Sequence, residues 1–525
     1  MKYAVVAGLL ALSTAAAAAP KPEPDDLPGP QPEGVKNLPK IDLPAVPAFD
    51  LPATEPGFHT PRELRVHGKP VLGTEIKVKG YITWIYDCAV AVAAANPKAT
   101  RAQIEVAIAT NPTLCERPKF YLGDAKTTSR DSSAWVVDVP RLPNKQERER
   151  LPKDELKAWP VVPKLALGDY VVVTGTWAIQ SPHAEHNTDG LLIYKALAPA
   201  QPAAPGAAVA PAAAAPPEPE VTVTTKIPLR RPVDEKVRNA SVDHLNACNK
   251  AIAARQYDAG IAECQAATKA WPENHLAWYA WASAHMAKGE WAAARDAVQH
   301  SVALRPDQGM YQLYHGISLY EAEQQQAREE QARKENKKPD EVAVNPAALK
   351  LDPARDALLR AIKLAPDLWR AHYYLGRLYR DRDDAKHAAE QFAATIKTHP
   401  SYRFGYIALI ELYRKWDYID EALAVALVGT TNVAASDASE LWFEVGMAYD
   451  ARHTDDKAID AFSKAIAGKP DDASSKFQRG QIYFRKGDFA SAKADLEAVV
   501  ASPDPRIASA KPVARQILAQ IATKH

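Results

Sequence analysis

The residues best suited to covalent chemistry are four cysteines, Cys88, Cys115, Cys248 and Cys264. They fall into two local pairs, and the chain has no Cys-x-x-Cys motif, which removes the usual redox and zinc signatures. In an oxidising compartment the economical pairing is Cys88–Cys115 and Cys248–Cys264, although four cysteines allow three connectivities. Buried free thiols remain the alternative for the second pair.

A second group of reactive side chains lies in the segment SPHAEHNTDG, which contains His183, Glu185, His186 and Asp189. Imidazoles and carboxylates can ligate a metal ion, but no further ligand set is visible in the sequence. We therefore expect a hairpin loop here, and neither a metal nor another cofactor.

Catalytic signatures are also missing from the sequence. It has no phosphate-binding Gly-rich loop, no G-x-S-x-G elbow, no H-E-x-x-H motif and no cysteine in a recognisable nucleophile setting. The sequence favours a protein that is not an enzyme, with no catalytic residue to assign.

The N-terminal residues indicate the compartment. Lys2, the apolar run from Ala4 to Leu12 and the small residues that follow predict a signal peptide over 1–19. The alternative is a membrane anchor, for which the run is shorter than the roughly 20 residues that cross a bilayer. We expect a periplasmic or secreted protein that is not an integral membrane protein. Its 65 basic and 64 acidic residues do not favour nucleic acid as a partner.

Two stretches rich in proline separate the folded parts, and the chain has 42 prolines in all. Residues 20–57 predict a disordered, extended arm, either a spacer or a ligand for a partner. Residues 198–240 contain irregular Ala and Pro and predict a linker.

Short alternating runs predict a β domain over 58–197. The runs lie near 71–87, 119–124, 133–140, 168–179 and 190–197, and Gly80 interrupts the first of them, which suggests a bulge or bend there. Five strands with this glycine placement resemble an OB-fold barrel, with helical insertions at 99–112 and 145–159. The resemblance implies ligand binding across the second and third strands, where Phe120, Tyr121 and Trp135 could stack on a ligand.

Internal repetition dominates residues 241–507. Prolines recur at a 34-residue spacing, from Pro272 to Pro306 and from Pro366 to Pro400. Two segments also place small and large residues at the offsets of the W-x2-L-G-x2-Y…A-x3-F…P pattern. The matching residues are His372, Leu375, Gly376, Tyr379, Ala388, Phe392 and Pro400, then Trp442, Val445, Gly446, Tyr449, Ala458, Phe462 and Pro470. These segments resemble tetratricopeptide repeats.

The resemblance implies a multidomain chain whose C-terminal part is an all-α superhelical solenoid of stacked helix pairs. We expect about seven repeats, a charged insertion in the third near 321–346, and a capping helix over 508–525. Cys248 and Cys264 would then join the two helices of the first repeat.

In tetratricopeptide proteins the first helix of each repeat lines a concave, ligand-binding groove. Carried onto this sequence, the groove positions form a basic and aromatic patch suited to an acidic or carboxylate-bearing peptide. They are Arg370, Tyr373, Tyr374, Arg377, Arg380, Arg414 and Lys415. The alternative is a solvated face that binds nothing in particular.

We therefore expect an exported scaffold of the bacterial cell envelope, whose repeats bind a protein or peptide while the OB-like domain binds a further envelope component. The alternative is an envelope ligand-binding protein whose OB-like domain binds polysaccharide or nucleic acid and whose repeats recruit it to an assembly.

Overall fold

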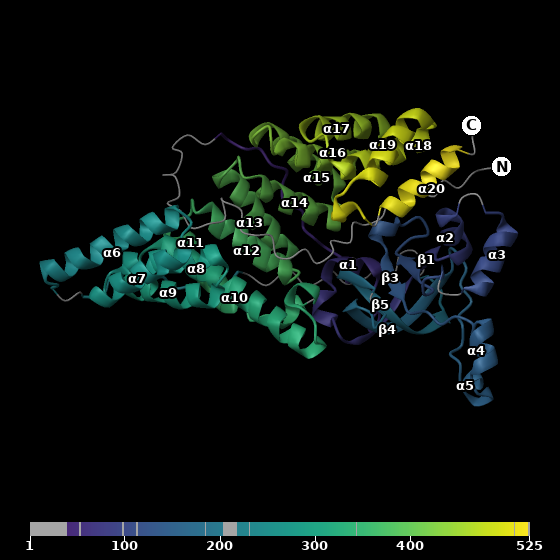
Figure 1. Cartoon of the computed structure of the whole chain (residues 1–525), viewed down its shortest axis with the longest axis horizontal. Helices are drawn as coiled ribbons and strands as arrows, with labels where there is room; N and C mark the ends of the chain where they lie inside the picture. The colour runs from purple at the N-terminus through teal and green to yellow at the C-terminus, as the bar shows by residue number, and fades with distance from the viewer. Residues whose placement is uncertain are drawn as a thin grey trace. The chain divides into compact units, whose positions relative to one another are not determined.

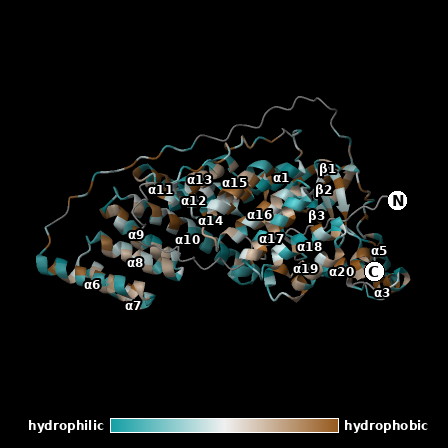
Figure 2. Cartoon of the chain, turned by 90° about the horizontal axis from the view of Figure 1, so that it is seen from above, coloured by the Kyte–Doolittle hydropathy of each residue, from teal (hydrophilic) through white to brown (hydrophobic). Residues whose placement is uncertain are grey.

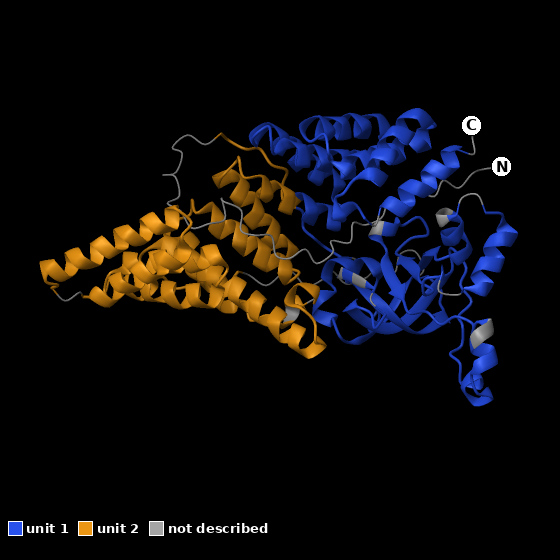
Figure 3. Cartoon of the chain, in the orientation of Figure 1, with its two compact units in different colours: residues 1–15, 47–214, 410–525 blue, residues 16–46, 215–409 orange. Residues whose placement is uncertain are grey.

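The computed structural model describes residues 39–522, except 52–53, 97–98, 112–113, 184, 203–217, 230–231, 343 and 509. The predicted signal peptide, most of the arm and much of the linker lie outside these residues. The chain divides into two compact units (Figure 3). The first joins Pro47–Ala214 to Ile410–His525, and the second is centred on Ala215–Leu409. The helical repeats are therefore shared between the two units.

Five strands form the β domain in the first unit (Figure 1). They are β1 (Glu75–Ile85), β2 (Phe120–Gly123), β3 (Ala134–Val137), β4 (Tyr170–Gln180) and β5 (His186–Pro199). Each strand pairs with two neighbours in the ring β1-β2-β3-β5-β4, which closes because β4 pairs with β1. All pairs are antiparallel except β3 with β5. The expected small β-barrel is confirmed.

The barrel core follows from strand alternation, since every second side chain of a strand faces the same side. Val78, Val136 and Val173 are fully buried inside the ring, and Trp177 is almost so. The register of β1 against β2 shifts between Ile82 and Trp84, so the bulge lies beyond Gly80. Gly80 allows Pro61 to pack closely against the strand, because a Cβ at residue 80 would lie 2.9 Å from the Pro61 ring.

Short helices decorate the barrel between its strands. The bounds are α1 (Pro61–His67), α2 (Cys88–Ala95), α3 (Arg101–Thr110), α4 (Lys145–Arg150) and α5 (Lys153–Lys157). Leu64 of α1 is buried in the barrel core, so this helix belongs to the barrel itself. Helices α3, α4 and α5 lie in the predicted insertions at 99–112 and 145–159, whereas α2 was not predicted. Helices α4 and α5 project from the strands in Figure 1.

Within the described residues, the helices from Glu235 to Ala501 form seven consecutive helix-turn-helix pairs. The pairs are α6 (Glu235–Ala253) with α7 (Tyr257–Ala270), α8 (His275–Lys288) with α9 (Trp291–Leu304), α10 (Gly309–Glu335) with α11 (Asp352–Leu364), α12 (Trp369–Asp381) with α13 (Ala385–Thr398), α14 (Arg403–Lys415) with α15 (Ile419–Asn432), α16 (Ala438–Ala451) with α17 (Asp455–Gly468), and α18 (Ala473–Lys486) with α19 (Phe489–Ala501). A final helix, α20 (Lys511–Ala522), packs against α19. Both hydrophilic and hydrophobic residues occur along these helices in Figure 2, as expected for helices that bury one face.

The charged segment in the third pair is largely an extension of its first helix. Helix α10 has 27 residues, whereas α8 and α12 have 14 and 13. After the helix ends at Glu335, two short 3-10 turns lead into α11. The segment therefore lengthens one helix of the pair and does not separate the pair.

Small residues allow the helices of a pair to approach closely. A Cβ at Gly376 would lie 2.7 Å from the Phe392 ring, and one at Gly446 would lie 2.6 Å from the Phe462 ring. Both rings are fully buried. The small and aromatic positions of the repeat pattern are thus packing positions.

The last part of the linker lies along the second unit. The Tyr379 hydroxyl of α12 donates to a Glu218 carboxylate oxygen at 2.9 Å, and Lys363 Nζ of α11 donates to the Val221 carbonyl at 3.1 Å. These contacts attach residues 218–221 to the repeats.

Candidate functional site

Helix α12 carries five of the predicted groove residues, namely Arg370, Tyr373, Tyr374, Arg377 and Arg380. The side chains of Arg370 and Tyr374 are buried, with exposed fractions of 8% and 5%. Arg370 also stacks on Trp369, with its guanidinium carbon 4.6 Å from the ring centroid. A large part of the predicted surface is therefore involved in packing the helices together.

Arg377 has an acidic partner within its own unit. Its Nη1 donates to Glu321 Oε1 of α10 at 3.1 Å, and its guanidinium lies about equally close to the rings of Tyr320 and Tyr374. Burial opposes the charged form of Arg377, but neighbouring Tyr320 and Glu321 raise its pKa. The positive charge is thus compensated by the helix that carries the insertion.

A second buried interaction joins the same two helices. The Tyr320 hydroxyl donates to Asp381 Oδ2 at 2.5 Å, and Gln324 Nε2 donates to the same oxygen at 3.1 Å. Burial raises the pKa of Tyr320 far above its usual value, and the Asp381 carboxylate adds to this effect. Polar residues of α10 and α12 therefore form a network that fixes how the third and fourth pairs meet.

The remaining two groove residues, Arg414 and Lys415, end α14 in the first unit. Arg414 Nη1 pairs with Glu444 Oε2 of α16 at 2.7 Å. Lys415 Nζ pairs with Asp189 Oδ1 of β5 at 2.7 Å, and the Lys415 carbonyl accepts a hydrogen bond from Arg65. Burial would raise the pKa of Asp189, but Lys415 lowers it below its usual range. Both cations already have partners, one of which comes from the β domain.

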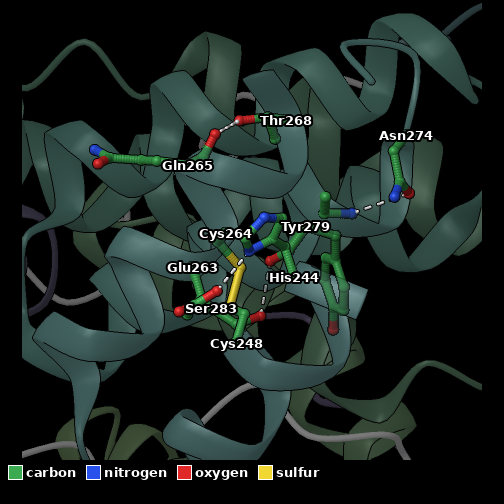
Figure 4. Close-up of a disulfide and its surroundings, with 10 residues drawn as sticks. His244, Cys248, Glu263, Cys264, Gln265, Thr268, Asn274, Tyr279 and Ser283 are labelled. Atoms are coloured by element: carbon green, nitrogen blue, oxygen red, sulfur yellow. Dashed lines mark hydrogen bonds and ion pairs between the residues drawn. A yellow bond between two sulfur atoms is a disulfide. The ribbon is translucent and has the colours of Figure 1, made fainter. Parts of the chain in front are cut away.

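Disulfides join both cysteine pairs in the structure. Cys88 at the start of α2 is bonded to Cys115, so the bond closes the segment that contains α2 and α3. Cys248 of α6 is bonded to Cys264 of α7, and both residues are fully buried between the helices of the first pair (Figure 4). Beside this bond, His244 Nδ1 and Glu263 Oε2 connect the same helices at 2.7 Å.

An aromatic strip crosses the outer side of the barrel on β1, β2 and β3. Tyr121 and Trp135 are stacked with their ring centroids 6.1 Å apart, and Trp84 meets Tyr121 edge to face at 5.2 Å. Tyr86 continues the strip beside Trp84. We call these four residues the aromatic strip. Phe120 does not belong to it: its side chain is fully buried in the barrel core, so its predicted stacking role is wrong.

Two cations cover parts of the aromatic strip. The guanidinium carbon of Arg130 lies 4.7 Å from the Trp84 ring and 4.9 Å from the Tyr121 ring. Lys119 Nζ lies 5.2 Å from the Trp135 ring and pairs with both Glu116 and Glu185. The sequence reasoning missed Trp84 and Tyr86 because regular alternation places them on the same face as the buried Ile82, whereas the register shift between Ile82 and Trp84 moves them off that face.

Three of the four residues that were considered as metal ligands pair with other residues. His183 Nδ1 pairs with Asp138 at 2.7 Å, Glu185 pairs with Lys119 and Asp189 pairs with Lys415. In the part of the chain that the structure describes, no group of three or more His, Cys, Asp or Glu side chains is arranged to hold a metal ion.

Family models match the helical pairs. One model, described as a tetratricopeptide repeat, matches residues 248–309 and 347–403, and a second with the same description matches 473–502. The chain carries tetratricopeptide repeats. Its seven helix pairs are consistent with a tetratricopeptide solenoid that includes these matched segments.

Several solved structures are similar to part of the chain at low sequence identity. The C-terminal part of a repeat protein from Cytophaga hutchinsonii is 10% identical, with 50% of this chain and 98% of that chain covered and a TM-score of 0.39. The PilF protein of Pseudomonas aeruginosa is 14% identical, with 45% and 95% covered and a TM-score of 0.34. A tetratricopeptide protein of Thermus thermophilus is 20% identical, with 40% and 98% covered and a TM-score of 0.30. No curated protein matches the chain.

Tetratricopeptide repeats usually bind other proteins, because the stacked pairs present extended surfaces that are independent of any catalytic site. Among the described residues, no helix is both long enough and apolar enough to span a bilayer.

Proposed function

We propose that this protein is an exported, non-catalytic tetratricopeptide scaffold that mediates protein-protein interactions in the bacterial cell envelope, in the periplasm or outside the cell. The observation that carries the proposal is the combination of seven helix pairs with a disulfide in each folded part. Disulfides persist in oxidising compartments and are rare in the cytosol. The predicted signal peptide over 1–19 points to the same compartment.

The scaffold binds its protein or peptide partner along α12, around Arg370, Tyr373 and Arg380, and around Arg414 and Lys415 at the end of α14. Arg377, Arg414 and Lys415 already pair with acidic residues of the chain. A peptide carboxylate is therefore favoured at these cations only where it joins the existing pairs, because breaking a buried ion pair leaves an uncompensated charge. The expected ligand is an extended acidic peptide.

The test compares capture of envelope proteins by the full-length chain and by two charge-reversal variants. Arg380→Glu changes the half-buried end of α12, whereas Lys386→Glu changes an exposed position of α13 outside the predicted groove. Capture should fall at least about tenfold in Arg380→Glu, as expected for the loss of a charge-assisted hydrogen bond. Lys386→Glu should capture as much as the wild type.

Equal capture by the two variants would place the partner elsewhere on the chain. Circular dichroism of both variants supplies the folding control.

The compartment of the protein is tested separately by alkylating thiols in intact cells before fractionation. Export predicts an oxidised chain in the envelope fraction, and a reduced cytosolic chain would contradict it.

A second candidate function comes from the aromatic strip. Trp84, Tyr86 and Trp135 are partly exposed, and rings of this kind can bind flat ligand faces by stacking, as proteins do with single-stranded nucleic acids. Lys119 is already paired with Glu116 and Glu185, and the single guanidinium of Arg130 over the strip is a small charge for a phosphate backbone. We therefore propose envelope polysaccharide as its ligand in preference to nucleic acid.

Titration of the full-length protein with soluble envelope polysaccharide tests this second function. Trp135→Ala should reduce affinity by about ten- to a hundredfold, the loss expected for one stacking platform. Trp159→Ala is the matched control, because Trp159 lies in the α4–α5 insertion and donates its Nε1–H to the Arg141 carbonyl. Equal affinity for the two variants would exclude the strip as the binding surface, and tight binding of an oligothymidylate would favour nucleic acid instead.

A further inference from the structure

Phe49, near the end of the Pro-rich arm, lies in an aromatic pocket of the first unit. Its ring centroid is 6.0 Å from that of Tyr413, 5.2 Å from that of Trp416 and 5.4 Å from that of Tyr418. The contacts with Trp416 and Tyr418 are nearly perpendicular, with interplanar angles of 86° and 89°. Edge-to-face geometry is favourable because the positive ring edge meets a negative ring face.

The pocket is built by the fifth helix pair without the arm. Tyr413 belongs to α14, while Trp416 and Tyr418 lie in the turn that leads to α15. Backbone hydrogen bonds hold this turn, with the Trp416 and Tyr418 amides both donating to the Tyr413 carbonyl. The three rings are therefore placed by the solenoid itself.

Phe49 is the single buried residue between 39 and 51, all of which the structure describes. Its neighbour Asp50 is exposed, and Pro47 precedes it by two residues. Its backbone has φ of 58°, in the left-handed region that bulky residues normally avoid. Burial of the ring must compensate for this unfavourable backbone conformation. The Phe49 ring is therefore the part of the arm that the pocket binds.

Tyr418 also contacts the arm through its hydroxyl. Burial raises the pKa of Tyr418, and a hydrogen bond with the Phe49 backbone partly opposes the rise. The pocket thus combines ring contacts with a backbone contact, as peptide-binding sites do.

We propose that the α14–α15 turn is a peptide-binding site for an aromatic side chain carried on a short segment with a preceding proline, and that Phe49 occupies this site in cis. The site lies outside α12 and is formed by aromatic rings, although Tyr413 and Trp416 flank Arg414 and Lys415 of the predicted groove. Because the arm is tethered, its effective concentration at the pocket is high, and an external segment of the same chemistry competes poorly until Phe49 leaves.

The test removes the Phe49 ring from the chain and offers the same ring on a separate peptide. A synthetic peptide with the sequence of residues 44–51, PAVPAFDL, is titrated calorimetrically into full-length wild type and full-length Phe49→Ala. We expect saturable binding to Phe49→Ala and at least about tenfold weaker binding to the wild type, which is the effect of a tethered competitor. The same peptide with Ala in place of Phe should bind neither protein.

Asp50→Ala is the matched control, since it changes an exposed neighbour and leaves Phe49 in the pocket. It should bind the peptide as weakly as the wild type. Failure of Phe49→Ala to bind the peptide, or equal affinity of wild type and Phe49→Ala, would overturn the proposal. So would a Phe49→Ala chain without its helical circular dichroism, because Phe49 would then belong to the folding core and not to a binding site.

Discussion

Arg65 Nη2 of α1 donates to Asp417 Oδ2 of the α14–α15 turn at 2.6 Å, although 352 residues separate the two along the chain. The same guanidinium donates from Nη1 to the Lys415 carbonyl at 2.5 Å, and Arg62 Nη2 donates to the Trp416 carbonyl at 2.9 Å. These carbonyls end α14, where the helix dipole is negative and the last carbonyls lack helical partners. Two arginines of the β domain therefore cap a helix of the solenoid.

Removing the Arg65 side chain should destabilise the first unit. Charge-assisted hydrogen bonds are worth about 1.5–3 kcal/mol each, and only 10% of the Arg65 side chain is exposed. We expect Arg65→Ala to lower the free energy of unfolding by about 2–3 kcal/mol, measured by urea denaturation.

A double-mutant cycle identifies the partner of Arg65. The combination of Arg65→Ala with Asp417→Ala should give a coupling energy of about 1 kcal/mol or more, whereas Arg65→Ala with Asp420→Ala should be additive. Additivity of the first pair would show that Arg65 and Asp417 do not interact in solution.

The Cys248–Cys264 disulfide should stabilise the first helix pair, which has no preceding repeat to pack against. A bond that closes a loop of 16 residues contributes about 3 kcal/mol in the chain-entropy treatment. Cys248→Ala with Cys264→Ala should therefore increase hydrogen exchange in α6 and α7 more than in α18 and α19. A thiol titration of the denatured, exported wild-type protein should find no free thiol, and any free thiol would contradict the pairing.

Gly376→Ala should strain the contact between α12 and α13. The new methyl group would meet the Phe392 ring at 2.7 Å, and overpacking a core of this kind costs about 1–3 kcal/mol. The measurement is the change in the free energy of unfolding, in wild type and in a Phe392→Leu background that has room for the methyl group. An equal cost in both backgrounds would show that the ring is not the obstacle.

Acid should destabilise the second unit through His315 of α10. Burial, together with the nearby charges of Arg360 and Arg295, lowers the pKa of His315 to about 4, and its Nδ1 is buried without a hydrogen-bond partner. Its folded pKa lies below the unfolded value, so the unfolded chain binds more protons between about pH 6.5 and 4. Stability from this group is present above that window and falls as the pH decreases through it.

The size of the His315 effect follows from the same shift. Between pH 7 and pH 5 the unfolding free energy should fall by about 2 kcal/mol more in wild type than in His315→Leu. The measurement is urea denaturation at both pH values, with His453→Leu, in a turn of the first unit, as the control. Parallel pH dependence of wild type and His315→Leu would show that His315 is not protonated on unfolding.

The sequence predicted the elements that depend on local pattern. The same glycine-to-phenylalanine contact recurs at fixed offsets because the two helices of each repeat pack in the same way. It joins Gly376 to Phe392 and Gly446 to Phe462. Strand alternation likewise placed most of the barrel strands, although β5 begins at His186, within the expected hairpin loop.

Contacts between residues far apart in the sequence were not predictable in the same way. Arg377 was assigned to a ligand because its position in the repeat faces the groove in related proteins, but its partner Glu321 lies in the insertion, which the repeat pattern does not describe. Phe49 gave no periodic signal, since one aromatic residue in a proline-rich arm has no neighbours that repeat its spacing. Such contacts depend on tertiary structure, which a pattern of local spacing does not encode.

The apolar helix α2, with the sequence CAVAVAAA, packs against α20, the last helix of the solenoid. A stack of identical units has no intrinsic end, because the surface that receives the next unit is present on the last one as well. A second molecule can pack on an uncovered terminal surface and continue the stack. Such head-to-tail contacts produce open-ended filaments unless the subunits close into a ring. The disulfide-closed insertion of the β domain contacts α20, so a second molecule that added to the contacted part of α20 would first have to displace that insertion.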